Sequence, residues 1–201
     1  MMEQGAATKR QITREDILPL DEYERVRDER RRAVTSMKKN RRVSVGPDVT
    51  FYFESYETML HQIHEMLRIE KGGEAQIEDE LRAYNPLIPD GHSLMATMMI
   101  EIEEPARRAR VLAELGGIED CVTMEFGGES VRAVPEGDVE RTTEQGKTSS
   151  VHFLKFPFTP EQVKAFTAPD VRVVLGISHS RYDHMSAVPQ TVRAELARDF
   201  A

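Results

Sequence analysis

The sequence predicts an α+β fold, with a mainly antiparallel sheet in the C-terminal half packed with helices and preceded by an N-terminal helical arm. Apolar residues recur at helical spacing over much of the first half. Runs of β-branched and aromatic residues joined by turn residues dominate the second half, without a regular βαβ alternation. The length of 201 residues favours one domain. We expect a flexible tail at 1–12 and a single domain at 13–201, with a helical part (13–90) and a sheet-rich part (91–201).

Three helices and a strand pair are expected in the helical part. A helix opens at Asp21, because Glu24 three residues later completes a capping-box pattern. Another helix follows Ser55, and a shorter one ends before Asn85, since the residue preceding Pro86 disfavours helical backbone. The expected helices therefore begin near residues 21, 55 and 75, and the expected strands cover 43–45 and 49–53.

The sheet-rich part contains five expected strands. Gly127 and Gly128 separate two of them with hairpin spacing. Pro105 opens a helix, and Thr159 opens another because Gln162 completes a capping box. Residues 135–148 form a long polar loop, which is typical of a mobile or functional segment. The expected strands cover 92–102, 121–126, 130–134, 149–158 and 171–177, and a last helix covers 189–200.

The composition restricts the class of protein. There are 27 basic and 35 acidic residues, and the net charge of −8 makes general nucleic-acid binding unfavourable. The single cysteine, Cys121, cannot form an intramolecular disulfide, which fits a reducing cytosol. The N-terminus has no apolar signal-peptide core, and the most apolar window, 94–102, is too short to span a bilayer. We therefore expect a cytoplasmic protein that does not enter membranes.

The common catalytic and cofactor motifs are absent from the sequence. It has no Gly-x-Gly-x-x-Gly, no P-loop, no Gly-x-Ser-x-Gly and no paired cysteines. No nucleotide cofactor is therefore indicated, and no motif assigns a reaction.

The second expected helix carries a polar sector opposite its apolar face. His61 and His64 are three residues apart and Glu65 follows directly, so imidazole and carboxylate groups share one side. Such groups are standard ligands of divalent metals, which makes these residues candidate ligands. An ordinary solvated helix face shows the same pattern. Both interpretations stay open at this point.

Two histidines extend the apolar faces of expected strands. The period of two places His152 on the face of Leu154, and His179 on the face of Leu175 and Ile177. Because histidine ligates metals and titrates near neutral pH, the pair could hold a metal or act as acid and base. The alternative is that each is a core histidine satisfied by hydrogen bonds.

Residues 30–42 hold seven basic side chains and no acidic one, so the rest of the chain carries a net charge of −15. Cations near a helix C-terminus favour its dipole, which is the simplest explanation. A docking surface for an acidic partner or for nucleic acid is the alternative. The candidate docking residues are Arg30, Arg31, Arg32, Lys38, Lys39, Arg41 and Arg42.

Several blocks of the sequence carry a family resemblance. The blocks are Gly46–Asp48, Phe53–Thr58, Gln62–Arg68, Tyr84–Asp90, Glu140–Thr142, Lys147–Phe153 and Gly176–Tyr182. Together they resemble the bacterial family called domain of unknown function 3501 (DUF3501), from about Thr13 onward. The polar positions that match the family pattern are Glu54, Thr58, Gln62, Glu65, Arg68, Arg141, Lys147, His152, His179 and Tyr182. His64 departs from that pattern, which moves the expected metal ligands to Glu65, His152 and His179.

The family is uncharacterised, so the resemblance implies no reaction. It implies a genomic neighbourhood, because genes of the family tend to lie beside genes for rubrerythrin-like proteins and an iron–sulfur oxidoreductase. Our first hypothesis is a cytoplasmic accessory protein of peroxide or iron-linked redox physiology that binds iron or zinc. Rubrerythrin-like and iron–sulfur proteins are then its expected partners. The expected ligand-binding residues are Arg68, Arg141, Lys147 and Tyr182, of which Arg141 and Lys147 would hold an anion. The alternative is a non-catalytic interaction module that docks through residues 30–42, and a homo-oligomer is compatible with both.

Overall fold

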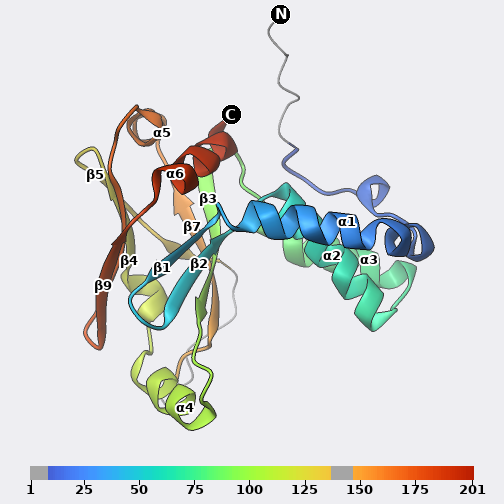
Figure 1. Cartoon of the computed structure of the whole chain (residues 1–201), viewed down its shortest axis with the longest axis horizontal. Coiled ribbons are helices and arrows are strands. Elements are labelled where there is room, and N and C mark those ends of the chain that lie inside the picture. The colour runs from blue at the N-terminus through green and yellow to red at the C-terminus, as the bar shows by residue number, and fades with distance from the viewer. Residues whose placement is uncertain (1–8, 137–146) are drawn as a thin grey trace, which may run out of the picture.

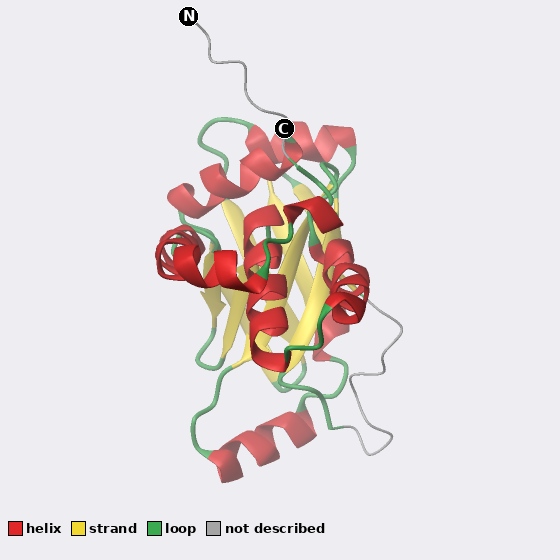
Figure 2. Cartoon of the chain, turned by 90° about the vertical axis from the view of Figure 1, so that its right-hand side faces the viewer, coloured by secondary structure: helices red, strands yellow, loops and turns green. Residues whose placement is uncertain are grey.

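The computed structural model describes residues 9–136 and 147–201, and it confirms the predicted α+β fold. Two antiparallel sheets pack face to face. Helices α1 (Leu20–Lys38), α2 (Tyr56–Glu70) and α3 (Glu74–Tyr84) form an arm to one side of them (Figure 1). Seen from that side, the arm helices lie in front of the strands (Figure 2). None of the helices in the described residues is long and apolar enough to cross a membrane.

The strands form two sheets of different sizes. The first has the order β1-β2-β3-β7-β6 and the second the order β5-β4-β8-β9, with every neighbouring pair antiparallel. The strands are β1 (Arg42–Val45), β2 (Val49–Phe53), β3 (Ser93–Ile100), β4 (Val122–Phe126), β5 (Glu129–Arg132), β6 (Val134–Pro135), β7 (Val151–Pro157), β8 (Val173–His179) and β9 (Tyr182–Ala187). The remaining α-helices are α4 (Pro105–Glu114), α5 (Pro160–Thr167) and α6 (Gln190–Leu196).

The arrangement of the strands differs from the expectation in two ways. The strands form two sheets rather than one, and the strand pair expected within residues 13–90, β1 and β2, joins the sheet of β3 and β7. The edge strand β9 was not predicted. Apart from Tyr182 its side chains are largely exposed, so they give no apolar alternation.

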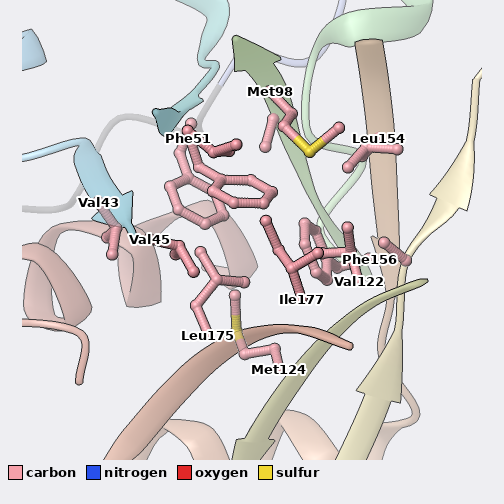
Figure 3. Close-up of a cluster of buried hydrophobic side chains, with 14 of the residues drawn as sticks. Val43, Val45, Phe51, Met98, Val122, Met124, Leu154, Phe156, Leu175 and Ile177 are labelled. Atoms are coloured by element: carbon pink, nitrogen blue, oxygen red, sulfur yellow. The ribbon is translucent and has the colours of Figure 1, made fainter. Parts of the chain in front are cut away.

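The main core lies between the two sheets (Figure 3). Because successive side chains of a strand point to opposite faces, alternate residues of each strand enter this core. It includes Val43, Val45, Phe51, Met98, Leu154 and Phe156 from the first sheet and Val122, Met124, Leu175 and Ile177 from the second. All of them are at least 95% buried.

A second, smaller core joins the arm to the outer face of the first sheet. Met95 and Phe153, which alternate with the residues of the main core, pack in this cluster with Met59 and Ile63 of α2. Ile12 is also buried there, and its backbone exchanges two hydrogen bonds with the Asn85 side chain. Ile12 is therefore held by its apolar side chain and by its two hydrogen bonds to Asn85, and residues 1–8 of the expected tail lie outside the described residues.

Capping chemistry explains where the helices begin. The Ser55 hydroxyl accepts a hydrogen bond from the Thr58 backbone N–H at the start of α2, and Thr159 caps α5 through the Gln162 N–H, as predicted. Helix α1 begins one residue earlier than expected, at Leu20, with no side-chain cap. Asp21 therefore lies in the first turn, where its negative charge favours the helix dipole.

Candidate functional site

His64 is a structural residue in the arm. Its side chain is 2% exposed and stacks on the Tyr23 ring at 4.5 Å. Its Nδ1 lies 2.8 Å from the Leu60 carbonyl oxygen, and its Nε2 accepts the Leu18 backbone N–H at 3.0 Å. Burial lowers the pKa of His64. Both ring nitrogens are thus occupied by backbone groups, which leaves no lone pair for the metal that His61 and His64 were expected to share.

Glu65 joins α2 to α1 through an ion pair. Both of its oxygens accept hydrogen bonds from the Arg27 guanidinium at 2.8 Å, and Oε1 also accepts the Tyr23 hydroxyl at 2.7 Å. The hydrogen bonds from Arg27 are the main reason that the pKa of Glu65 falls to about 2. His61 lies beside this pair, with Nδ1 3.2 Å from the Tyr23 hydroxyl. The geometry is that of a packed charge pair between two helices.

His152 lies inside the sheet sandwich, in phase with Leu154 as the strand period predicts. It is 1% exposed, and its Nε2 lies 2.9 Å from the Ser149 carbonyl oxygen and 3.0 Å from the Thr148 hydroxyl. Its Nδ1 lies 3.7 Å from a Glu119 carboxylate oxygen. These neighbours come from the residues before β7 and from the turn before β4, so His152 ties two loops to the core.

His179 ends β8 and is held by different groups. Its Nε2 lies 3.2 Å from the Gly116 carbonyl oxygen, and its Nδ1 accepts the Arg181 backbone N–H at 3.2 Å. Within residues 9–136 and 147–201, no three histidine, cysteine or carboxylate side chains are placed to hold a metal ion. Glu65, His152 and His179 therefore do not come together as the predicted ligand set: Glu65 belongs to the arm, and the two histidines belong to different sheets.

The residues expected to bind an anion are also apart. Arg68 pairs with Glu24 at 2.8 Å across the arm, and Lys147 is exposed at the start of the second described range. Arg141 lies outside the described residues. The Tyr182 hydroxyl donates to the Val45 carbonyl at 2.7 Å and accepts two backbone N–H groups of the β1–β2 turn, at 3.0 and 3.1 Å. That uses its whole hydrogen-bonding capacity, so Tyr182 pins the turn to β9.

The basic segment at 30–42 divides into three environments. Arg41 is 2% exposed and pairs with Asp199 near the C-terminus, so it is a structural residue and not part of a docking surface. Arg30 and Lys38 are half-buried within the arm. Arg31, Arg32 and Lys39 are exposed along one side of α1, with Thr35 and Ser36 between them, and Arg42 is exposed on β1.

We call Arg31, Arg32, Thr35, Ser36 and Lys39 the basic stripe. With Asp28 they line a shallow hollow of about 400 Å³. Among the described residues, no carboxylate forms an ion pair with Arg31, Arg32 or Lys39. Arg32 donates one hydrogen bond, to the backbone oxygen of Asp28. The N-terminal half of α1 behaves differently, since Arg25 pairs with Asp21 and Arg27 with Glu65.

A cavity of about 250 Å³ lies between the arm and the outer face of the first sheet. It was not predicted as a site, although its sheet residues share the strand face opposite the main core and so could be found by the period of two. The lining residues are Lys38, Tyr52, Glu54, Met59, Gln62, Tyr84, Leu87, Thr97, Met99, Val151 and Phe153. Glu54 and Gln62 are among the polar positions that match the family pattern.

Two of three comparisons with known proteins found a match to this chain. A family model described as a protein of unknown function (DUF3501) matches residues 11–200. A crystal structure of a novel protein of unknown function from Burkholderia pseudomallei has 39% sequence identity and a TM-score of 0.87, over 94% of this chain and 99% of that one. No curated protein matches the chain. The family match confirms the resemblance carried by the sequence blocks.

Proposed function

Because the chain belongs to the DUF3501 family, whose function is unknown, we propose from its own geometry that it is a non-catalytic interaction module that docks an acidic protein partner through the basic stripe. The observation that carries this proposal is the absence, in the described residues, of ion pairs to Arg31, Arg32 and Lys39. Other exposed arginines of the arm, such as Arg25 and Arg82, have carboxylate partners within the chain.

The charge distribution supports a protein partner. A local cluster of positive charge on a chain of net charge −8 attracts an acidic surface and orients it, while the acidic remainder repels nucleic acid. The basic stripe lies on the C-terminal half of α1, at the end of the helix that meets the sheets (Figure 1), and its three cations are exposed. Arginine suits such a surface because its planar guanidinium binds carboxylates with two parallel hydrogen bonds.

In this proposal, the link to peroxide or iron-linked redox physiology comes from the partner protein and not from a metal in this chain. The resemblance predicts rubrerythrin-like and iron–sulfur proteins of the cytoplasm as partners, and these supply the proteins to test. A metal site in this chain has less support, because Glu65 accepts hydrogen bonds from Arg27 and Tyr23, and both ring nitrogens of His179 contact backbone groups.

Charge reversal of the basic stripe tests the proposal. The triple variant Arg31→Glu, Arg32→Glu and Lys39→Glu should weaken binding to the purified rubrerythrin-like or iron–sulfur partner by about tenfold or more, corresponding to about 1.4 kcal/mol. The affinity of the unaltered protein should also fall between about 0.05 M and 0.3 M salt, because the contact is screened. Calorimetric titration measures both effects.

A matched triple variant separates local from general electrostatics. Arg110, Lys164 and Arg172 are exposed basic residues outside the arm. Reversing these three changes the net charge equally and should leave the affinity within about twofold. Equal weakening by both triples, binding to neither candidate partner, or tighter binding to duplex DNA than to protein would contradict the proposal.

A further inference from the structure

The cavity between arm and sheet brings opposite charges together at a buried place. Glu54 follows β2 and is 6% exposed, while Lys38, the last residue of α1, lines the same space from the other element. No ion pair joins Glu54 to Lys38 or to any other cation of the described residues, although both line a cavity of about 250 Å³. A buried carboxylate without a cation beside it, in a cavity that an ammonium group also lines, favours an occupant that carries both charges.

The Glu54 carboxylate is positioned by the protein but not neutralised by it. Oε2 accepts the Thr58 hydroxyl at 2.7 Å, and Oε1 accepts the Thr97 hydroxyl at 2.6 Å. Each carboxylate oxygen has a second lone pair, so one hydroxyl on each oxygen fixes the orientation and leaves acceptor capacity toward the cavity. The two hydroxyls come from α2 and β3, which makes Glu54 a fixed acceptor at the junction of arm and sheet.

The remaining walls determine the shape of an occupant. Met59, Met99 and Phe153 supply apolar surface, and Gln62 and Tyr84 supply polar groups at the same cavity. A predominantly apolar wall with a few fixed polar groups is the usual composition of a small-molecule site. Thioether side chains adapt to ligands of different shape because they are unbranched and polarizable.

We propose that this cavity binds a small dipolar molecule, with an ammonium group at Glu54, an anionic group at Lys38 and a short apolar body against Met59 and Met99. The class is that of a free amino acid or a similar short zwitterion. The charges of such a molecule complement both side chains at once, and its net charge of zero leaves the total charge of the cavity unchanged. This site is separate from the basic stripe, so either proposal can fail without the other.

Norleucine is a suitable probe, with hexanoate and pentylamine as probes that each keep one charged end. Methionine methyl groups labelled with ¹³C report the location of binding, because Met59 and Met99 line the cavity whereas Met185 is 75% exposed on β9. Norleucine should shift the Met59 and Met99 methyl signals, leave the Met185 signal unchanged, and bind more tightly than either single-charge probe.

Two variants test which side chain binds each charged end of norleucine. Glu54→Gln should weaken norleucine and pentylamine binding about tenfold or more while leaving hexanoate unaffected. Lys38→Met should weaken norleucine and hexanoate binding by a similar factor while leaving pentylamine unaffected. Glu103→Gln and Lys164→Met, at exposed positions away from the cavity, are the matched controls. A dispersed methionine spectrum shows that each variant is folded. No shift at Met59 and Met99 in the unaltered protein, or norleucine binding that is equal in Glu54→Gln, would overturn the proposal and indicate a water-filled cavity.

Discussion

Two arginine–carboxylate pairs hold the two regions of this molecule, and they differ in burial. In the arm, Arg27 and Glu65 join α1 to α2, with side chains 21% and 19% exposed. In the body, Arg41 and Asp199 join the chain after α1 to the C-terminus, with side chains 2% and 9% exposed. The Arg27–Glu65 contact, at 2.8 Å, uses both carboxylate oxygens, and the Arg41–Asp199 contact, at 2.5 Å, uses one, so the pairs differ in geometry as well as in burial.

The two carboxyl groups respond in opposite directions. Hydrogen bonds from Arg27 lower the pKa of Glu65 to about 2, because water still solvates both charges and the pairing dominates. Burial raises the pKa of Asp199 to about 6, although Arg41 lies against it and opposes the change. An ion pair therefore favours the charged carboxylate only where the free-energy cost of desolvation is smaller than the stabilisation by the partner charge.

The largest expected effect follows from breaking the buried pair. Arg41→Met removes the guanidinium from Asp199 and also leaves the backbone oxygens of Phe53 and Glu54 without their donors. We expect a loss of about 3–5 kcal/mol in the free energy of unfolding, measured by urea denaturation. The double variant Arg41→Met with Asp199→Leu should recover part of this loss, because no uncompensated charge stays buried. A double variant that is no more stable than Arg41→Met would contradict this account.

A smaller effect is expected for another polar group buried in the body, the Tyr182 hydroxyl. Tyr182→Phe deletes a hydroxyl that serves one carbonyl and two N–H groups of the β1–β2 turn. We expect a loss of about 2–3 kcal/mol in the free energy of unfolding, since unsatisfied buried backbone groups are costly. Hydrogen exchange should become faster at the amides of Asp48 and Val49, and unchanged exchange there would show that water replaces the hydroxyl without cost.

The pair in the arm should matter less. Arg27→Met leaves Glu65 partly solvated and still bound to the Tyr23 hydroxyl, so we expect a loss of only about 1–2 kcal/mol. Thermal unfolding of this variant beside Arg41→Met compares the two regions directly. A loss as large as that of Arg41→Met would show that burial does not determine the difference.

The same comparison explains how far the sequence predicts the molecule. Local rules work where the cause is local: Ser55 and Thr159 cap their helices, and the period of two places His152 in the core. Long-range partners escape such rules. Arg41 and Asp199 are 158 residues apart, and the nitrogens of His179 are occupied by loop backbone groups that no spacing reveals.

The candidate sites show the same limit. The charge run at 30–42 is visible in the sequence, but only the packing separates buried Arg41 from exposed Arg31 and Lys39. Lys38 belongs to the same run, yet it lines a cavity with Glu54, because α1 ends above the outer face of the first sheet. A pattern of residue types thus predicts which side chains carry charge, while tertiary packing decides what each charge contacts.

The smallest expected effect is a dependence of stability on pH that has opposite signs in the two regions. The pKa of Asp199 is raised in the folded state, so its contribution is fully present below pH 4 and is lost as the pH rises through about 6. The pKa of Glu65 is lowered, so its contribution is present above about pH 5 and is lost as the pH falls toward 2. Nearby Glu57 and Glu195 add to the rise at Asp199.

Two neutral variants isolate these contributions by urea denaturation across pH. Relative to Asp199→Asn, the unaltered protein should lose about 1 kcal/mol between pH 5 and pH 6, and relative to Glu65→Gln it should lose about 1 kcal/mol between pH 4 and pH 3. Equal slopes for protein and variant in either window would show that the pair in that region titrates alike folded and unfolded. Slopes of the same sign would mean that pairing with Arg41 outweighs burial at Asp199, because desolvation is the largest cause of its raised pKa and the charges of Glu57 and Glu195 add to it.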